Sequence, residues 1–143
     1  MPAINSKERC FIDTNLLIYA DSGDEPAKQR IALSLLKQLR LNQTGVLSTQ
    51  VLGEYCNVAI NKLKIPHADI REQMKFWEQY EVVQVTPAII LMGLDLHQTR
   101  SLGFFDALIV AAAKTSGCTV LYSEDMNASE MVNGVRIVNP FRV

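Results

Sequence analysis

Long apolar runs are missing from this chain of 143 residues. No run approaches the roughly 20 apolar residues that a membrane-spanning helix needs. The first ten residues, MPAINSKERC, also lack the apolar segment of a secretory signal peptide. We therefore expect a cytoplasmic protein that makes no use of a membrane.

Cysteine and histidine are scarce and widely spaced. The three cysteines, Cys10, Cys56 and Cys118, form no C-x-x-C pair, which argues against a disulfide framework and against a thiolate zinc site. The two histidines, His67 and His97, are far apart, so a histidine metal site or a Ser–His–Asp triad is poorly supported. We expect the cysteines in the core and the histidines on the surface.

An excess of positive charge is also absent. Lys and Arg number 14 against 15 Asp and Glu, which gives a net charge of −1. A domain that binds nucleic acid with its whole surface would be strongly basic, so a polyanionic ligand would need a local basic patch together with a metal ion. We expect most basic residues on solvated helix faces. The candidates for such a patch are Arg9, Lys28, Arg30, Lys37, Arg40, Lys62, Lys64 and Arg100.

Short apolar strands alternate with helical patterns along the chain. The composition, 48% hydrophobic and 20% charged, is that of an ordinary folded protein, and the length fits a single domain over residues 1–143. Helices between consecutive strands predict a parallel sheet covered on both faces, a three-layer α/β/α sandwich. We expect strands at 9–13, 45–48, 81–85, 119–122 and 135–138. We expect helices from 16 (capped by Asn15), 27–41, 49–63, 66–77, 87–100 and 104–116.

Four acidic residues stand where a strand gives way to a helix or loop, or near the start of a helix. Asp13 closes an apolar strand and Asp106 lies within an apolar helix, while Glu54 and Asp125 follow two other strands. Each alone has an ordinary explanation, such as helix capping. An unpaired charge in apolar surroundings costs several kcal/mol, and no matching interior Lys or Arg stands nearby in sequence. Together these four, the acidic quartet, indicate a bound divalent cation, Mg²⁺ or Mn²⁺.

The motifs around these acids resemble those of PIN-domain nucleases, and in particular the VapC-like toxins of type II (VapBC) toxin–antitoxin systems. The resemblance covers residues from about 9 to 139. It rests on Phe11-Ile12-Asp13-Thr14-Asn15, Ser48-Thr49 before Glu54, Asp106-Ala107-Leu108-Ile109-Val110, and Leu121-Tyr122-Ser123-Glu124-Asp125.

The resemblance implies a PIN-like sandwich and metal-dependent hydrolysis of RNA phosphodiester bonds. By position it makes Asp13, Glu54, Asp106 and Asp125 the catalytic ligands of Mg²⁺ or Mn²⁺. It makes Thr14, Asn15 and Ser123 supporting groups that orient carboxylates or metal-bound water. Glu124 is an adjacent competitor for the role of Asp125, because the family's basic and aromatic continuation does not follow here.

Three alternatives remain. A haloacid-dehalogenase-like phosphatase or a receiver domain also places Asp after a buried strand, but the phosphatase needs a second Asp where this chain has Asn15, and the receiver's acidic pair and late Lys do not stand out. A non-enzymatic binding module would not need costly buried acids. A stand-alone RNA-processing nuclease is the nearest alternative to a toxin.

The toxin interpretation also predicts protein partners. We expect a cognate antitoxin segment, amphipathic and basic, in an apolar groove beside the metal site, formed by helices 27–41 and 54–63 with Lys62 and Lys64 at its rim. A homodimer through other apolar helix faces is the companion expectation.

Overall fold

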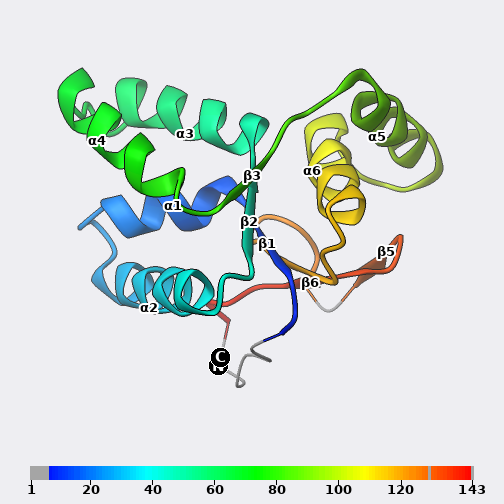
Figure 1. The fold of residues 1–143 in the computed structure, drawn as a ribbon, viewed down its shortest axis with the longest axis horizontal. Helices are drawn as coiled ribbons and strands as arrows, with labels where there is room; N and C mark the ends of the chain where they lie inside the picture. Colours follow the sequence, from blue (N-terminus) through cyan, green and yellow to red (C-terminus); the bar gives the residue numbers. More distant parts are fainter. Residues whose placement is uncertain (1–6, 129, 143) are drawn as a thin grey trace.

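The computed structural model describes residues 7–128 and 130–142, which form one central sheet between two layers of helices. Figure 1 shows α1 to α4 on one side of the sheet and α5 and α6 on the other. The elements are β1 (Cys10–Ile12), α1 (Thr14–Asp21), α2 (Pro26–Asn42), β2 (Gly45–Ser48), α3 (Thr49–Asn61), α4 (His67–Trp77), β3 (Glu81–Val83), α5 (Pro87–Thr99), α6 (Phe104–Thr115), β4 (Val120–Tyr122), β5 (Met131–Val132) and β6 (Val135–Val138). No helix of the described residues has the length and apolar character needed to cross a membrane.

The sheet has six strands in the order β3-β2-β1-β4-β6-β5, and all neighbours are parallel except β5 and β6. Strands β1, β2 and β4 are buried along their whole length, which is why their sequences are apolar runs rather than alternating patterns. The predicted three-layer α/β/α sandwich with a mostly parallel sheet is confirmed.

Helix α6 forms the centre of one helical layer. Its residues 107–113 are all buried, because the helix packs between the sheet and α5. Helix α1 begins directly after β1 and contacts α2 and α3 on the other face. Helices α1 and α6 therefore bring Thr14 and Asp106, which line the same cavity, together from opposite layers (Figure 1).

The predicted cap of the first helix was wrong. Helix α1 begins at Thr14, and its N-cap is Asp13, whose extended backbone ends β1 and whose carboxylate accepts a hydrogen bond from the Thr14 N–H. Asn15 therefore lies inside the first turn, and its side chain is free to bond elsewhere. Helix α3 is capped by Ser48, whose side chain accepts a hydrogen bond from the Val51 N–H.

Strand β5 was not predicted. It pairs antiparallel with β6 through a tight turn at Asn133 and Gly134, which have φ values of 53° and 83°. An Asn-Gly pair favours this turn because both central residues need a positive φ. The sequence therefore contained the signal for this hairpin.

The contact between α5 and α6 depends on Gly93. A Cβ atom added there would lie 3.1 Å from Leu108 Cα and 3.3 Å from its backbone N, atoms that cannot move aside as a side-chain end can. Gly53, in the interior of α3, is a matched control, since a Cβ there would meet nothing within 4 Å.

We predict that Gly93→Ala lowers the free energy of unfolding by about 1–2 kcal/mol, because overpacking outweighs the gain in helix propensity. Gly53→Ala should raise the same quantity by about 0.5–1 kcal/mol, since only the propensity changes. Urea denaturation of both variants beside the wild type measures the difference. Equal stabilisation by the two substitutions would contradict the close approach of α5 and α6.

Candidate active site

The candidate site lies where β1 and β4 end side by side in the middle of the sheet. Successive strands move from β1 to β2 and β3 on one side, whereas β4 pairs with β1 on the other, so the order reverses between β1 and β4. Ligands of open α/β sheets collect at such a reversal, beyond the carboxyl ends of the strands. The Asp13 N–H donates to the Tyr122 carbonyl at 3.0 Å, which joins the two strand ends directly.

Asp13 is a buried carboxylate with only 4% of its surface exposed. Its Oδ1 accepts from the Thr14 N–H and its Oδ2 from the Ser123 hydroxyl, both at 2.7 Å. Burial raises the pKa of Asp13 to about 6 although these two hydrogen bonds oppose the shift, and the nearby charges of Glu54 and Asp106 raise it further. The apo protein therefore holds this charge at a cost.

Glu54 approaches from α3, which starts at the end of β2. Its Oε1 accepts from the Thr14 hydroxyl at 2.7 Å, and its Oε2 lies 3.4 Å from Gln50 Nε2. Gln50 Nε2 also donates to the Phe105 carbonyl at 3.2 Å, so it links α3 to the start of α6. Thr14 and Gln50 thus direct Glu54 toward the other acids. Thr14 was predicted as a supporting residue, whereas Gln50 was not.

Asp125 is held by Asn15. The Asn15 amide donates to Asp125 Oδ2 at 3.1 Å, and its carbonyl oxygen accepts from the Glu124 N–H at 3.4 Å. Ser123 completes the arrangement, because its hydroxyl accepts from the Asp125 N–H at 3.2 Å while it donates to Asp13. The supporting positions predicted at Asn15 and Ser123 therefore connect the loop after β4 to the end of β1.

Asp106 lies in the first turn of α6, where the positive end of the helix dipole favours a carboxylate. Burial raises its pKa, and the charges of Asp125 and Glu54 raise it further. Among the residues that the structure describes, no side chain donates a hydrogen bond to it and no cation pairs with it. Its oxygens are available to a ligand.

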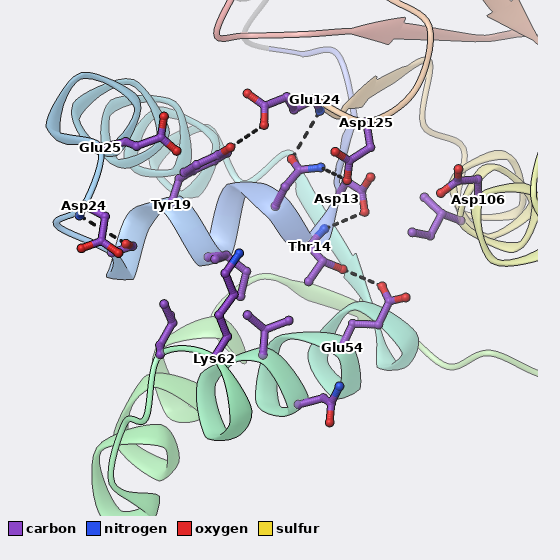
Figure 2. A pocket seen from close by; sticks show the side chains of 17 residues that line it. Asp13, Thr14, Tyr19, Asp24, Glu25, Glu54, Lys62, Asp106, Glu124 and Asp125 are labelled. Atoms are coloured by element: carbon purple, nitrogen blue, oxygen red, sulfur yellow. Dashed lines mark hydrogen bonds between the residues drawn. The ribbon is translucent and has the colours of Figure 1, made fainter.

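All four acids line one cavity of about 550 Å³ (Figure 2). Figure 2 shows Asp13, Asp125 and Glu54 on one side of it and Asp106 facing them from α6. The cavity continues away from the acids between α1 and α3, where its apolar walls are Ile18, Val58 and Leu63. Lys62 is the one basic residue among its described lining.

The arrangement has the right chemistry for Mg²⁺ but is not closed around one point. Within residues 7–128 and 130–142, no three Asp, Glu, His or Cys side chains already meet as ligands of a single ion. The donors are carboxylate oxygens, and Mg²⁺ commonly takes only one or two protein carboxylates and completes its octahedron with water. The residues fit such an ion, with Asp13 and Asp106 lacking any other cation in the described chain.

Glu124, the competitor of Asp125, is occupied elsewhere. Its two oxygens accept from Lys28 Nζ at 2.6 Å and from the Tyr19 hydroxyl at 2.5 Å. Lys28 was a candidate for a local basic patch toward a polyanion, but its ammonium group instead bridges to the loop after β4. Sequence reasoning missed this pair since 96 positions separate the two residues.

The predictions for the cysteines are partly confirmed, and two candidate basic residues are paired with acids. Cys10 and Cys118 are buried as predicted, whereas Cys56 is only partly buried. Arg9 and Arg100 pair with Glu81 and Glu130, so neither is a free cation for a polyanion.

The structure is similar to a toxin–antitoxin complex from Klebsiella pneumoniae, with a TM-score of 0.71 and 19% identity over 94% of this chain and 99% of that chain. It is also similar to the sarcin–ricin loop cleaving toxin VapC20 of Mycobacterium tuberculosis (TM-score 0.62, 20% identity, 81% and 89% covered). A third likeness is to DNA-bound VapBC from Salmonella typhimurium (TM-score 0.68, 18% identity, 91% and 96% covered).

At these identities the solved structures support the fold alone. No curated protein gives a significant sequence match. The family model of the PIN domain, however, matches residues 10–133, which span every acid of the quartet. The chain belongs to the PIN-domain family.

Proposed function

We propose that this protein is a Mg²⁺- or Mn²⁺-dependent endoribonuclease and the toxin of a toxin–antitoxin pair. The observation that carries the proposal is the meeting of four carboxylates at one cavity, one of them 4% exposed, with no cation paired to any of them in the described chain. Carboxylates in this state repel one another and call for a positive ligand. RNA as substrate rests on family membership and on the similarity to VapC20, a toxin that cleaves the sarcin–ricin loop.

Asp13, Glu54, Asp106 and Asp125 would hold the metal. A bound divalent cation would shield the phosphodiester and lower the pKa of a water molecule that attacks it. Thr14, Asn15 and Ser123 fix the orientations of Glu54, Asp125 and Asp13 through the hydrogen bonds described above. Lys62 projects into the cavity and is placed to contact a neighbouring phosphate.

The same cavity supports an antitoxin contact. The predicted contribution of α2 to the groove is wrong, because the apolar residues of this helix are buried in the core. They are Ala32, Leu35, Leu36 and Leu39. The apolar wall beside the acids comes from Ile18 of α1 and from Val58 and Leu63. A basic, amphipathic segment would lay its apolar side chains on this wall and direct a cation to the carboxylates. That several similar structures are toxin–antitoxin complexes supports this part of the proposal.

A homodimer is proposed through α5. Ile90, Leu91 and Leu94 of this helix are 41%, 61% and 51% exposed. Three large aliphatic side chains on one short helix form an apolar surface on the helical layer opposite the groove between α1 and α3. A second copy of the chain would cover it symmetrically.

RNA cleavage tests the proposal. The purified protein should cleave RNA with Mg²⁺ or Mn²⁺ and lose this activity in EDTA. Asp13→Asn and Asp106→Asn should each reduce the rate by about 100-fold or more, since each removes a ligand charge that the transition state uses. Asp95→Asn, on the exposed side of α5, is the control and should stay within a few-fold of wild type. Cleavage that persists in chelator and in Asp13→Asn would contradict the metal mechanism.

The stability of the metal-free protein should depend on pH through Asp13. Its pKa is raised in the folded state, so the folded protein holds the proton more tightly than the unfolded chain. The contribution of Asp13 to the free energy of unfolding is fully present below the ordinary pKa of the carboxyl group. It is lost as pH rises through about 6, and the loss is roughly 3 kcal/mol for a shift of this size.

Urea denaturation in EDTA across this pH range measures the loss. Asp13→Asn should abolish most of the decline and be more stable than wild type at neutral pH, whereas Asp95→Asn should keep the wild-type slope. Mg²⁺ should stabilise the wild type more than Asp13→Asn. A decline that is the same in wild type and Asp13→Asn would assign the effect to other groups.

Partner binding is tested by light scattering and by inhibition. Leu91→Glu should convert a dimer to a monomer, because it places a charge in the centre of the α5 surface, while Leu41→Glu, an equally exposed change on α2, should not. The product of the neighbouring gene should inhibit cleavage. A wild type that is monomeric at high concentration and is not inhibited would leave a stand-alone PIN-type nuclease.

A further inference from the structure

We propose that Lys28, Tyr19 and Glu124 form a clasp that positions Asp125 in the acidic site. The proposal rests on the proposed function, because it concerns the geometry of a metal-binding carboxylate. Lys28 does not line the cavity. It would therefore be a positioning residue, which acts through Glu124 on the loop that carries Asp125.

The clasp uses both oxygens of Glu124. Lys28 Nζ lies 2.6 Å from Oε2, the Tyr19 hydroxyl lies 2.5 Å from Oε1, and Lys28 Nζ also lies 3.2 Å from that hydroxyl. The three groups thus form a closed triangle of hydrogen bonds. Burial would raise the pKa of Glu124, but the bonds from Lys28 and Tyr19 outweigh it and lower the pKa, so Glu124 stays ionised.

Aromatic rings support the ammonium group. Lys28 Nζ lies 4.8 Å from the centre of the Tyr19 ring and 5.8 Å from that of Phe141, and these two rings meet edge to face at 4.9 Å. The Lys28 side chain is 32% exposed and that of Glu124 is 22% exposed. The pair is therefore partly shielded from water, which separates it from fully exposed ion pairs of little strength.

The loop after β4 is also anchored by Met126, which is buried in the core with 6% of its surface exposed. The chain leaves regular structure after Tyr122 and forms bends at residues 124–126. The hydrogen bonds of Ser123 and Asn15 fix the face of the loop toward β1 and α1. The clasp joins Glu124 to α2, so Asp125 lies between the clasped Glu124 and the buried Met126. Loss of the clasp would free the Glu124 side chain and allow the short backbone segment between Ser123 and Met126 to reorient.

Two simple models of Lys28 predict opposite effects on metal binding. If Lys28 acted only through its charge, its removal would make the site more negative and tighten the binding of a divalent cation. If Lys28 positions Asp125, its removal weakens binding, since groups that orient metal ligands are commonly worth about 10-fold or more in affinity. The sign of the change separates the two models.

The experiment is calorimetric titration of the metal-free protein with Mn²⁺. Lys28→Met should weaken binding by about 10-fold, and Lys28→Arg should restore most of it because a guanidinium can still reach the carboxylate. In an Asp125→Asn background, Lys28→Met should cause no further loss, because the clasp acts through that carboxylate. Lys37→Met, an exposed lysine of the same helix, is the matched control and should bind as wild type does.

Tyr19→Phe is a second variant that keeps the ring packing against Phe141 and removes only the hydroxyl bond to Glu124, and it should weaken Mn²⁺ binding by a smaller factor. Urea denaturation in EDTA shows that each variant is folded. Tighter or unchanged binding in Lys28→Met, or a loss that is fully retained in the Asp125→Asn background, would overturn the clasp alone. A wild type that binds no Mn²⁺ would overturn the proposed metal site and the clasp with it.

Discussion

The buried carboxylate of Asp13 is the constraint on which the rest of the site depends. It directly follows the central strand β1, caps α1, accepts a hydrogen bond from the Ser123 hydroxyl and is 4% exposed. Two hydrogen bonds do not offset the cost of burial, since its pKa is raised to about 6. An uncompensated charge at the centre of a sheet is tolerated when another requirement maintains it, and a cationic ligand is the simplest such requirement.

The parallel sheet explains how distant residues reach this carboxylate. Parallel neighbours end at the same edge, so β1, β2 and β4 deliver Asp13, the start of α3 and the 123–125 loop together. Helix α6 brings Asp106 from the opposite helical layer. The hydrogen bonds of Thr14, Asn15 and Ser123 then join these segments in pairs. The fold supplies proximity, and the small polar side chains supply orientation.

Local patterns predicted most of the fold. Fully buried strands and capped helices are encoded within a few residues, as Ser48 and Pro26 illustrate. Asn15 was predicted as the cap of the first helix although capping was also an ordinary explanation for Asp13, and one carboxylate can both cap a helix and bind a ligand. The β5–β6 hairpin was missed although Asn133-Gly134 signals it, because strands of two residues give almost no periodicity.

Only part of the candidate site could be predicted from the sequence, for a physical reason. Acidic residues in apolar segments can be recognised in the sequence, because burying an unpaired carboxylate there costs free energy. The ion pair between Lys28 and Glu124 gives no such signal in the sequence. A lysine on a helix face is ordinary, and its partner is determined by the tertiary structure alone. The two kinds of residue also differ in how their charge is balanced: burial raises the pKa of Asp13 and Asp106, whereas the carboxylate of Glu124 is paired with Lys28. Pairing Glu124 leaves Asp125 as the free acid of the loop, so the basic residue on α2 helps to determine which of two adjacent carboxylates is available to a cation.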